Sequence, residues 1–162
     1  MFCHQCQETM RNQGCNAAKG VCGKTQEVSD LQDLLLYTCK GIGYWATKAG
    51  EKGLFDEETA FFVDRMLFAT ITNANFSASE FTAWTLEALK RRDAIKAAYL
   101  KAGGKPDASL PAAALWSAND AEGIKAATAK GSGGWLAVQD EDRRSLESLV
   151  LYGLKGMAAY IE

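Results

Sequence analysis

The sequence contains a single histidine, His4, and only two prolines, Pro106 and Pro111. A serine–histidine–aspartate triad could therefore contain only His4 as its histidine. No glycine-rich segment matches a phosphate-binding fingerprint. No apolar run approaches the ~18 residues that a membrane-spanning helix needs. The first residues also lack the basic and apolar segments of a secretory signal, so we expect a cytoplasmic protein with no membrane partner.

An excess of positive charge is also missing. Lysine and arginine number 18 against 20 acidic residues, which gives a formal net charge of −2. Nucleic-acid binders usually carry a basic stripe. The one short basic run, Lys90-Arg91-Arg92, is followed at once by Asp93, and we interpret it as a solvated helix face. Nucleic acid is therefore excluded as an expected partner.

Cysteine, in contrast, is concentrated at the start of the chain. Cys3, Cys6, Cys15 and Cys22 follow the spacing C-x2-C-x8-C-x6-C. In a reducing compartment, such a group indicates a metal or an iron–sulfur cluster more often than disulfides. Four-cysteine zinc sites usually show two short C-x2-C pairs, whereas this chain has one, so the spacing favours an iron–sulfur cluster over zinc. With four thiolate ligands the expected role is electron transfer.

Two further residues, His4 and Cys39, have side chains that can bind a metal. His4 lies between Cys3 and Cys6 and is a candidate to replace one of them, although four cysteines make this unnecessary. Cys39 falls on the apolar face of a predicted helix, and we expect it to be buried and unligated. The aromatic residues at helical spacing are predicted to belong to the core; they are Trp45, Phe61, Phe62, Phe68 and Trp84.

Apolar residues recur at helical spacing over most of the remaining chain, which predicts an all-α fold. Residues 1–28 form an irregular cluster-binding loop, 29–104 a three-helix bundle, 105–142 an irregular connection, and 143–162 a final helix. We expect the three helices of the bundle to begin at Ser29-Asp30, Asp56 and Ser77, which are capping residue types. Asn119-Asp120 is expected to cap one short helix in the connection.

The final helix repeats the first. Residues 31–41 align with residues 146–156 without gaps, and the two share the motif Tyr-x-x-Lys-Gly. Leu154 occupies the position of Cys39. If the first copy opens a three-helix bundle, the second should open another, so we expect the chain to be a fragment. In the chain alone, we expect the apolar face of residues 143–162 to be covered by the first bundle or, preferably, by the same helix of a second copy in a homodimer. The missing downstream domains are the other expected partners.

Several motifs resemble hybrid-cluster proteins, also called prismane proteins or hydroxylamine reductases, over the whole chain. These are Met1-Phe2-Cys3-His4-Gln5-Cys6-Gln7-Glu8-Thr9, Gly14-Cys15, Gly20-Val21-Cys22-Gly23-Lys24, Leu31-Gln32-Asp33-Leu34-Leu35, Glu141-Asp142-x-Arg144-Ser145-Leu146 and Tyr152-Gly153-Leu154-Lys155-Gly156.

The resemblance implies an N-terminal helical domain whose four cysteines hold one cluster. It also implies downstream domains with a hybrid iron–sulfur–oxygen cluster that reduces hydroxylamine or nitric oxide. The ligands of that hybrid cluster have no counterpart in this chain, so the chain alone is expected to be inactive.

The spacing of the cysteines bears on the cluster type. In one form of the family, the gap between the second and third cysteines is the same as here, the gap between the third and fourth is slightly shorter, and the cluster is [4Fe–4S]. In another form the gap between the second and third cysteines is longer, the gap between the third and fourth is the same as here, and the cluster is [2Fe–2S]. The flanking residues favour [4Fe–4S], with [2Fe–2S] as the alternative. A zinc-stabilised helical interaction module is the competing function.

Overall fold

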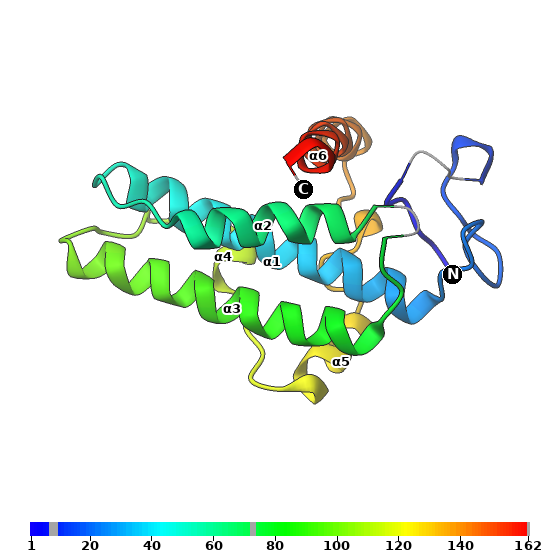
Figure 1. Ribbon diagram of the computed structural model, residues 1–162, viewed down its shortest axis with the longest axis horizontal. Coiled ribbons are helices and arrows are strands. Elements are labelled where there is room, and N and C mark those ends of the chain that lie inside the picture. Colours follow the sequence, from blue (N-terminus) through cyan, green and yellow to red (C-terminus); the bar gives the residue numbers. More distant parts are fainter. Residues whose placement is uncertain (7–9, 72–73, 162) are drawn as a thin grey trace.

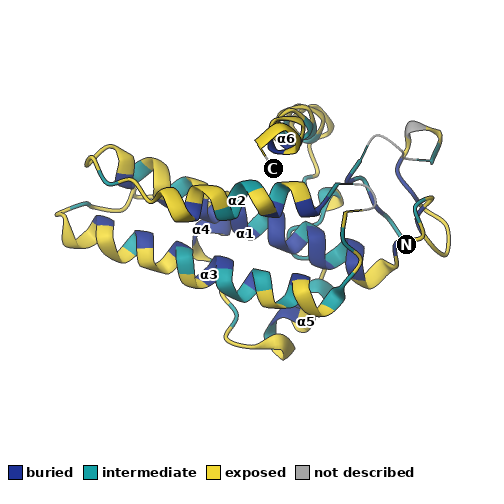
Figure 2. Ribbon diagram, viewed as in Figure 1, coloured by how far each residue is buried: buried dark blue, intermediate teal, exposed yellow. Residues whose placement is uncertain are grey.

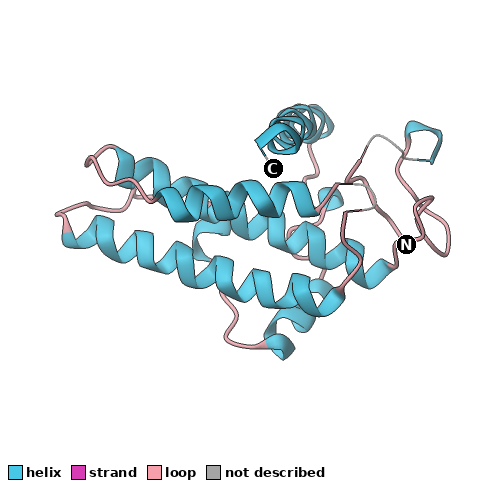
Figure 3. Cartoon of the chain, in the orientation of Figure 1, coloured by secondary structure: helices cyan, strands magenta, loops and turns pink. Residues whose placement is uncertain are grey.

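The structure of the chain is a computed structural model that describes residues 1–6, 10–71 and 74–161. The described residues contain six α-helices and two short 3-10 helices joined by loops (Figure 3). The only β-type pairing among these residues is an isolated bridge. The predicted all-α fold is confirmed. In this described part, no helix combines the length and the apolarity that crossing a membrane requires.

Three long helices lie lengthwise beside one another: α1 (Gln26–Gly50), α2 (Glu57–Ala69) and α3 (Ala78–Lys101) (Figure 1). The core lies mainly between α1 and α3, where Leu34, Trp45 and Phe81 are fully buried. Figure 2 shows the buried residues concentrated on the inner faces of the helices. The burial of Trp45 was predicted, but Phe61 and Phe68 on α2 are exposed, because α2 contacts α1 over a short stretch only.

Two of the three predicted helix starts are confirmed. The Asp56 side chain accepts from the backbone N–H of Thr59 at 2.9 Å, and Ser77 accepts from that of Glu80 at 3.3 Å. The first helix begins earlier than predicted, because Thr25 caps it instead of Ser29-Asp30. Ser29 is buried inside the first turn, and its Oγ donates to the carbonyl oxygen of Phe2 at 3.0 Å. The serine thus ties α1 to the N-terminal loop.

The connection between α3 and the last helix contains more regular structure than predicted. It holds α4 (Ala112–Leu115), α5 (Ala121–Ala129) and the 3-10 helix η2 (Trp135–Ala137). Asp120 caps α5 as predicted by accepting from the N–H of Gly123 at 2.8 Å. The short α4 packs on α1, where the indole of Trp45 donates to the Ala114 carbonyl at 3.2 Å.

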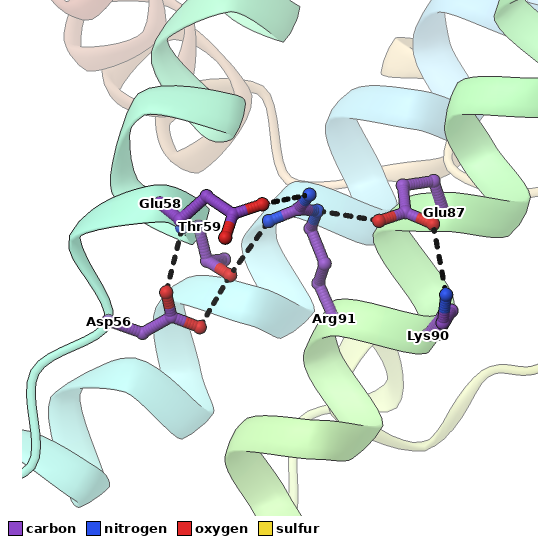
Figure 4. A network of polar contacts seen from close by, with 6 residues as sticks. All are labelled: Asp56, Glu58, Thr59, Glu87, Lys90 and Arg91. Carbon is purple, nitrogen blue, oxygen red and sulfur yellow. Dashed lines mark hydrogen bonds and ion pairs between the residues drawn. The ribbon is translucent and has the colours of Figure 1, made fainter.

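The basic run on α3 is the predicted solvated face only at Lys90, whose side chain is 81% exposed. Arg91 forms ion pairs with Glu58 of α2 at 2.9 Å and with Glu87 of α3 at 2.8 Å (Figure 4). Arg92 is buried and donates to the carbonyl of Trp116, and also to Asp93 at 2.7 Å. For Arg91 and Arg92 the prediction was wrong, because Glu58 and Trp116 come close to α3 only in the folded chain.

The last helix, α6 (Glu141–Ile161), crosses α2 and presents its far side to solvent (Figure 1). Lys155 and Ala158 are its buried residues, and Leu151 and Tyr152 are partly buried. The apolar face predicted for this helix is exposed, with Leu149 at 70%. Its members are Leu146, Leu149, Val150, Gly153, Met157 and Ile161.

The two copies of the repeated motif generate a prediction about their glycines. A Cβ on Gly41 would lie 2.2 Å from the carbonyl oxygen of Ala113, whereas one on Gly156 would meet open space. Gly41→Ala should therefore destabilise the chain by about 1–3 kcal/mol through overpacking. Gly156→Ala should be neutral, or stabilising by about 0.5–1 kcal/mol, because alanine favours a helix. Urea unfolding of both variants measures the difference, and equal stabilities would contradict the α1–α4 contact.

Candidate metal centre

The N-terminal loop is held together by backbone pairing at two of its cysteines. Cys3 and Cys15 exchange N–H···O hydrogen bonds of 2.9 and 2.8 Å in an isolated antiparallel bridge. Gly14 precedes the second of them with a φ of 91°, and a side chain there would collide with the ring of Phe2. Glycine at this position therefore allows the chain to turn back beside its own start.

Cys22 lies in a second tight turn. The Gly20 N–H donates to the Lys24 carbonyl at 2.9 Å, and the Gly23 N–H donates to the Gly20 carbonyl at the same distance. This turn directs the chain into α1 and leaves Cys22 partly buried. Glycines on both sides of the cysteine thus set the local backbone, as the composition of the loop indicated.

All five cysteines are free thiols. Cys3 and Cys15 are buried side by side, and Cys6 and Cys22 are partly buried. Within residues 1–6, 10–71 and 74–161, no three His, Cys, Asp or Glu side chains are close enough together to hold a metal ion. The structure therefore brings together one pair of the predicted ligands, and the convergence of all four stays a prediction.

Cys39 lies apart from this group. It is buried on α1 within the core, as predicted, and burial raises the pKa of its thiol to about 12. At neutral pH it is therefore a protonated and unreactive side chain. The repeat argument for its burial does not hold, because its counterpart Leu154 is 44% exposed.

Two lysines are buried next to the cysteine loop. Lys24 donates to the side-chain oxygen of Gln32, and its Nζ lies 3.9 Å from the Sγ of Cys3. Lys155 reaches the loop from α6 and donates to the backbone and side-chain oxygens of Gln5, at 2.7 and 2.6 Å. Lysine is almost never fully buried unless it is paired. The loop therefore contains two enclosed positive groups that bond to neutral amide and carbonyl oxygens.

Titration behaviour reflects this environment. Burial, reinforced by the positive charge of Lys24, lowers the pKa of Lys155 to about 7; Asp33, Cys3 and Cys6 act against it. Asp33 on α1 accepts from the amide of Gln5. Burial raises the pKa of this carboxyl to about 6, although the hydrogen bond favours its charged form. Lys155 is therefore enclosed beside the positive charge of Lys24, and Asp33, Cys3 and Cys6 supply the opposing negative charge.

A stack of aromatic rings covers one side of the loop. His4 stacks on Trp135 of η2, with ring centres 4.5 Å apart, and also on Tyr152 of α6, with ring centres 5.7 Å apart. Arg144 lies over the indole of Trp135 at 4.5 Å. Phe2 also stacks on Trp135. The stack joins the loop, η2 and α6 into one unit.

His4 is fixed within this stack by hydrogen bonds. The hydroxyl of Tyr152 donates to the His4 carbonyl at 2.8 Å and also contacts the His4 Nδ1. Burial, together with the negative charge of Cys6 and Cys3, raises the pKa of Tyr152 to about 12, so the hydroxyl keeps its proton. Burial lowers the pKa of His4. One ring nitrogen of His4 is thus already engaged with Tyr152.

The sequence did not point to Lys24, Gln5, Trp135, Tyr152 or Lys155 as members of the site. The available signal was the repeated Tyr-x-x-Lys-Gly, which amphipathicity alone does not require. Its second copy supplies both Tyr152 and Lys155 to the cysteine loop.

The donor set fits an anionic group held by sulfur. Thiolates bind soft metals and iron–sulfur clusters, and the enclosed ammonium groups of Lys24 and Lys155 favour a negatively charged assembly beside them.

Comparison with known proteins gives one family and a consistent set of relatives. The model of the Prismane/CO dehydrogenase family matches residues 1–162. Hydroxylamine reductase of Desulfitobacterium hafniense strain Y51 is 51% identical over 162 residues, covering 100% of this chain and 29% of that protein. Hydroxylamine reductase of Halothermothrix orenii is 49% identical over 168 residues, covering 100% of the chain and 30% of the relative. The chain thus spans about three tenths of the length of these relatives.

The burial of the cysteines predicts an order of reactivity in the metal-free chain. Cys6 and Cys22 are partly exposed and should react first with iodoacetamide at pH 7.5. Cys39, whose raised pKa keeps it as a thiol, should react only when the chain unfolds. Peptide mass spectrometry over a time course measures the order. Early modification of Cys39 in a folded chain would show that its place in the core is wrong.

Proposed function

The chain belongs to the prismane/CO dehydrogenase family, and from that premise we propose that it is the N-terminal electron-transfer part of a hydroxylamine-reductase-like oxidoreductase. Cys3, Cys6, Cys15 and Cys22 would hold an iron–sulfur cluster, of the [4Fe–4S] rather than the [2Fe–2S] type. When bound, such a cluster takes up and gives up single electrons. The electrons would pass to a hybrid cluster held by residues outside this chain, where hydroxylamine or nitric oxide is reduced.

The observation that carries the proposal is the position of Lys24. Its buried Nζ lies 3.9 Å from the Sγ of Cys3, so an enclosed ammonium group stands directly beside one of the proposed ligands. Cys15 lies beside Cys3 through the backbone bridge. The names of the relatives support the activity of a longer parent protein. The compartment we propose is the cytoplasm, where thiols stay reduced.

The other residues of the site would orient and shield the cysteine loop. Lys155 and Gln5 fix the backbone between Cys3 and Cys6 from the side of α6. The stacked rings of His4 and Trp135 cover the loop and limit the access of water. A drier surrounding strengthens electrostatic effects on a redox centre.

A zinc-stabilised helical interaction module without redox activity is the alternative. The four cysteines and the enclosed lysines suit a zinc–thiolate site as well, because it is also anionic. The two functions differ in colour, since zinc thiolates do not absorb visible light. Anaerobic purification with analysis of iron, acid-labile sulfide and zinc separates them.

Substitution of the ligands tests the assignment. Cys3→Ser, Cys6→Ser, Cys15→Ser and Cys22→Ser should each lose most of the iron, the sulfide and the visible absorption, because each thiolate is proposed to hold the same cluster. Cys39→Ala is the matched control and should keep the wild-type content. Full iron and sulfide in Cys15→Ser would refute the ligand set.

The same preparations test whether the chain is active alone. With four protein thiolates no iron is left open for substrate, so adding hydroxylamine or nitric oxide should not oxidise a reduced dye. A rate of oxidation that scales with the wild-type chain and vanishes in Cys15→Ser would contradict the electron-transfer role.

The exposed apolar face of α6 suggests where partners bind. In the parent protein we propose that the downstream domains cover Leu149 and Met157; in the chain alone, the same face of a second copy would do so. The first bundle does not cover it, because α6 contacts α2 through its opposite side. Burying one large apolar side chain contributes about 1.5–3 kcal/mol.

Light scattering measures the association of the isolated chain. The wild type should be a dimer, and the double variant Leu149→Glu, Met157→Glu should be a monomer. Leu100→Glu, at an exposed apolar position on α3, serves as the control and should stay dimeric. A wild-type monomer at high concentration, with rapid amide hydrogen exchange across residues 143–162, would rule out the dimer.

A further inference from the structure

Two lysine side chains are enclosed where a hydrophobic contact would be expected. Lys24 is 2% exposed and Lys155 is 4% exposed. Each comes from a different part of the chain, one from the turn after Cys22 and the other from α6. Buried ammonium groups are normally paired with carboxylates. Here the oxygens to which the two lysines donate are the uncharged ones of Gln32 and Gln5.

The nearby carboxylate of Asp33 favours the charged form of Lys155, but it acts from the far side of Gln5. Asp33 accepts from the amide of Gln5, so the residue between it and Lys155 is neutral. On the other side, Lys24 lies within hydrogen-bonding distance of the Sγ of Cys3. Among the groups whose negative charge favours the charged form of Lys155, Asp33 comes first, followed by Cys3 and Cys6. Besides Asp33, the anionic groups that these lysines face are therefore cysteine sulfurs.

A cluster with four thiolate ligands carries the charge that this arrangement lacks. Four thiolates around an oxidised iron–sulfur core leave a net charge of about −2, and reduction by one electron makes it about −3. Positive groups fixed nearby in a low-dielectric surrounding interact more strongly with the reduced state. They therefore raise the reduction potential of the centre, in addition to balancing its charge.

We propose that Lys24 and Lys155 are the counter-charges of the cysteine-held cluster and raise its reduction potential. The inference rests on the proposed function, because it requires the cluster to be present. Both lysines act as positioning residues and touch no substrate. Because Lys155 belongs to α6, the potential of the centre also depends on the docking of that helix on the loop.

The repeated motif provides an internal comparison. Lys40 occupies the position in the first Tyr-x-x-Lys-Gly that Lys155 occupies in the second. Its Nζ is on the surface and forms an ion pair with Glu147 at 2.7 Å. Removing Lys40 takes away the same charge from the chain without emptying the space beside the cysteines. Lys40→Met is therefore the matched control for Lys155→Met.

The test is a set of potentiometric titrations on the reconstituted chain. Wild type, Lys24→Met, Lys155→Met and Lys40→Met are reduced stepwise with redox dyes under anaerobic conditions, and the cluster is followed by visible absorption and electron paramagnetic resonance. Each buried-lysine variant should lower the equilibrium constant for reduction at least tenfold, which is about 59 mV for one electron. Lys40→Met should match the wild type. Wild-type potentials in both buried-lysine variants would overturn the inference.

Iron and sulfide content keeps this failure distinct from that of the proposed function. If the wild-type chain binds no iron, the proposed function fails and the inference fails with it. If all proteins carry the cluster at one potential, only the inference fails.

If Lys155→Met cannot retain iron, two other substitutions of the same residue are tested. Lys155→Arg keeps the charge and Lys155→Gln removes it. Retention of the cluster by the arginine variant and its loss, or a lowered potential, in the glutamine variant supports the inference. Loss in both, or retention in both at the wild-type potential, overturns it.

Discussion

The hydrogen bonds from Lys155 to both oxygens of Gln5 connect the last helix of the chain to its first residues. They require an ammonium group to stay inside the protein, where it is stable only beside negative charge. In the proposed function, Asp33 and the metal-bound sulfurs of the cysteine loop would provide that charge. The position of α6 and the shape of the loop would then depend on the same enclosed charge as the chemistry of the site.

The helical bundle gives this contact a fixed platform. α1 contributes Ser29, Gln32 and Asp33 from its first two turns, each bonded to the loop or to a buried lysine. Further along α1, Trp45 anchors α4. The aromatic stack then joins η2 and α6 over the loop. A loop too polar to fold alone is in this way held by long-range contacts, and a bound metal centre would add to its stability.

Local patterns predicted the helices well, because caps and periodicity are properties of neighbouring residues. Asp56, Ser77 and Asp120 cap the helices that the sequence assigned to them. Contacts between distant segments were not visible in the same way. The sequence predicts Arg92 to be a surface charge, because its contact with the carbonyl of Trp116 exists only in the folded chain. Likewise Lys155 shares its motif with Lys40, and only the folded chain shows that one is enclosed and the other exposed.

Hydrogen–deuterium exchange, compared between the metal-free chain and the chain loaded with iron and sulfide, tests the central claim most directly. If one anionic centre ties α6 to the loop, the amides of Cys3, Cys15 and Cys22 and those around Lys155 should all become protected when the cluster forms. Slow exchange confined to the loop, with α6 unchanged, would contradict the claim that the buried lysine of α6 responds to the charge of the cluster.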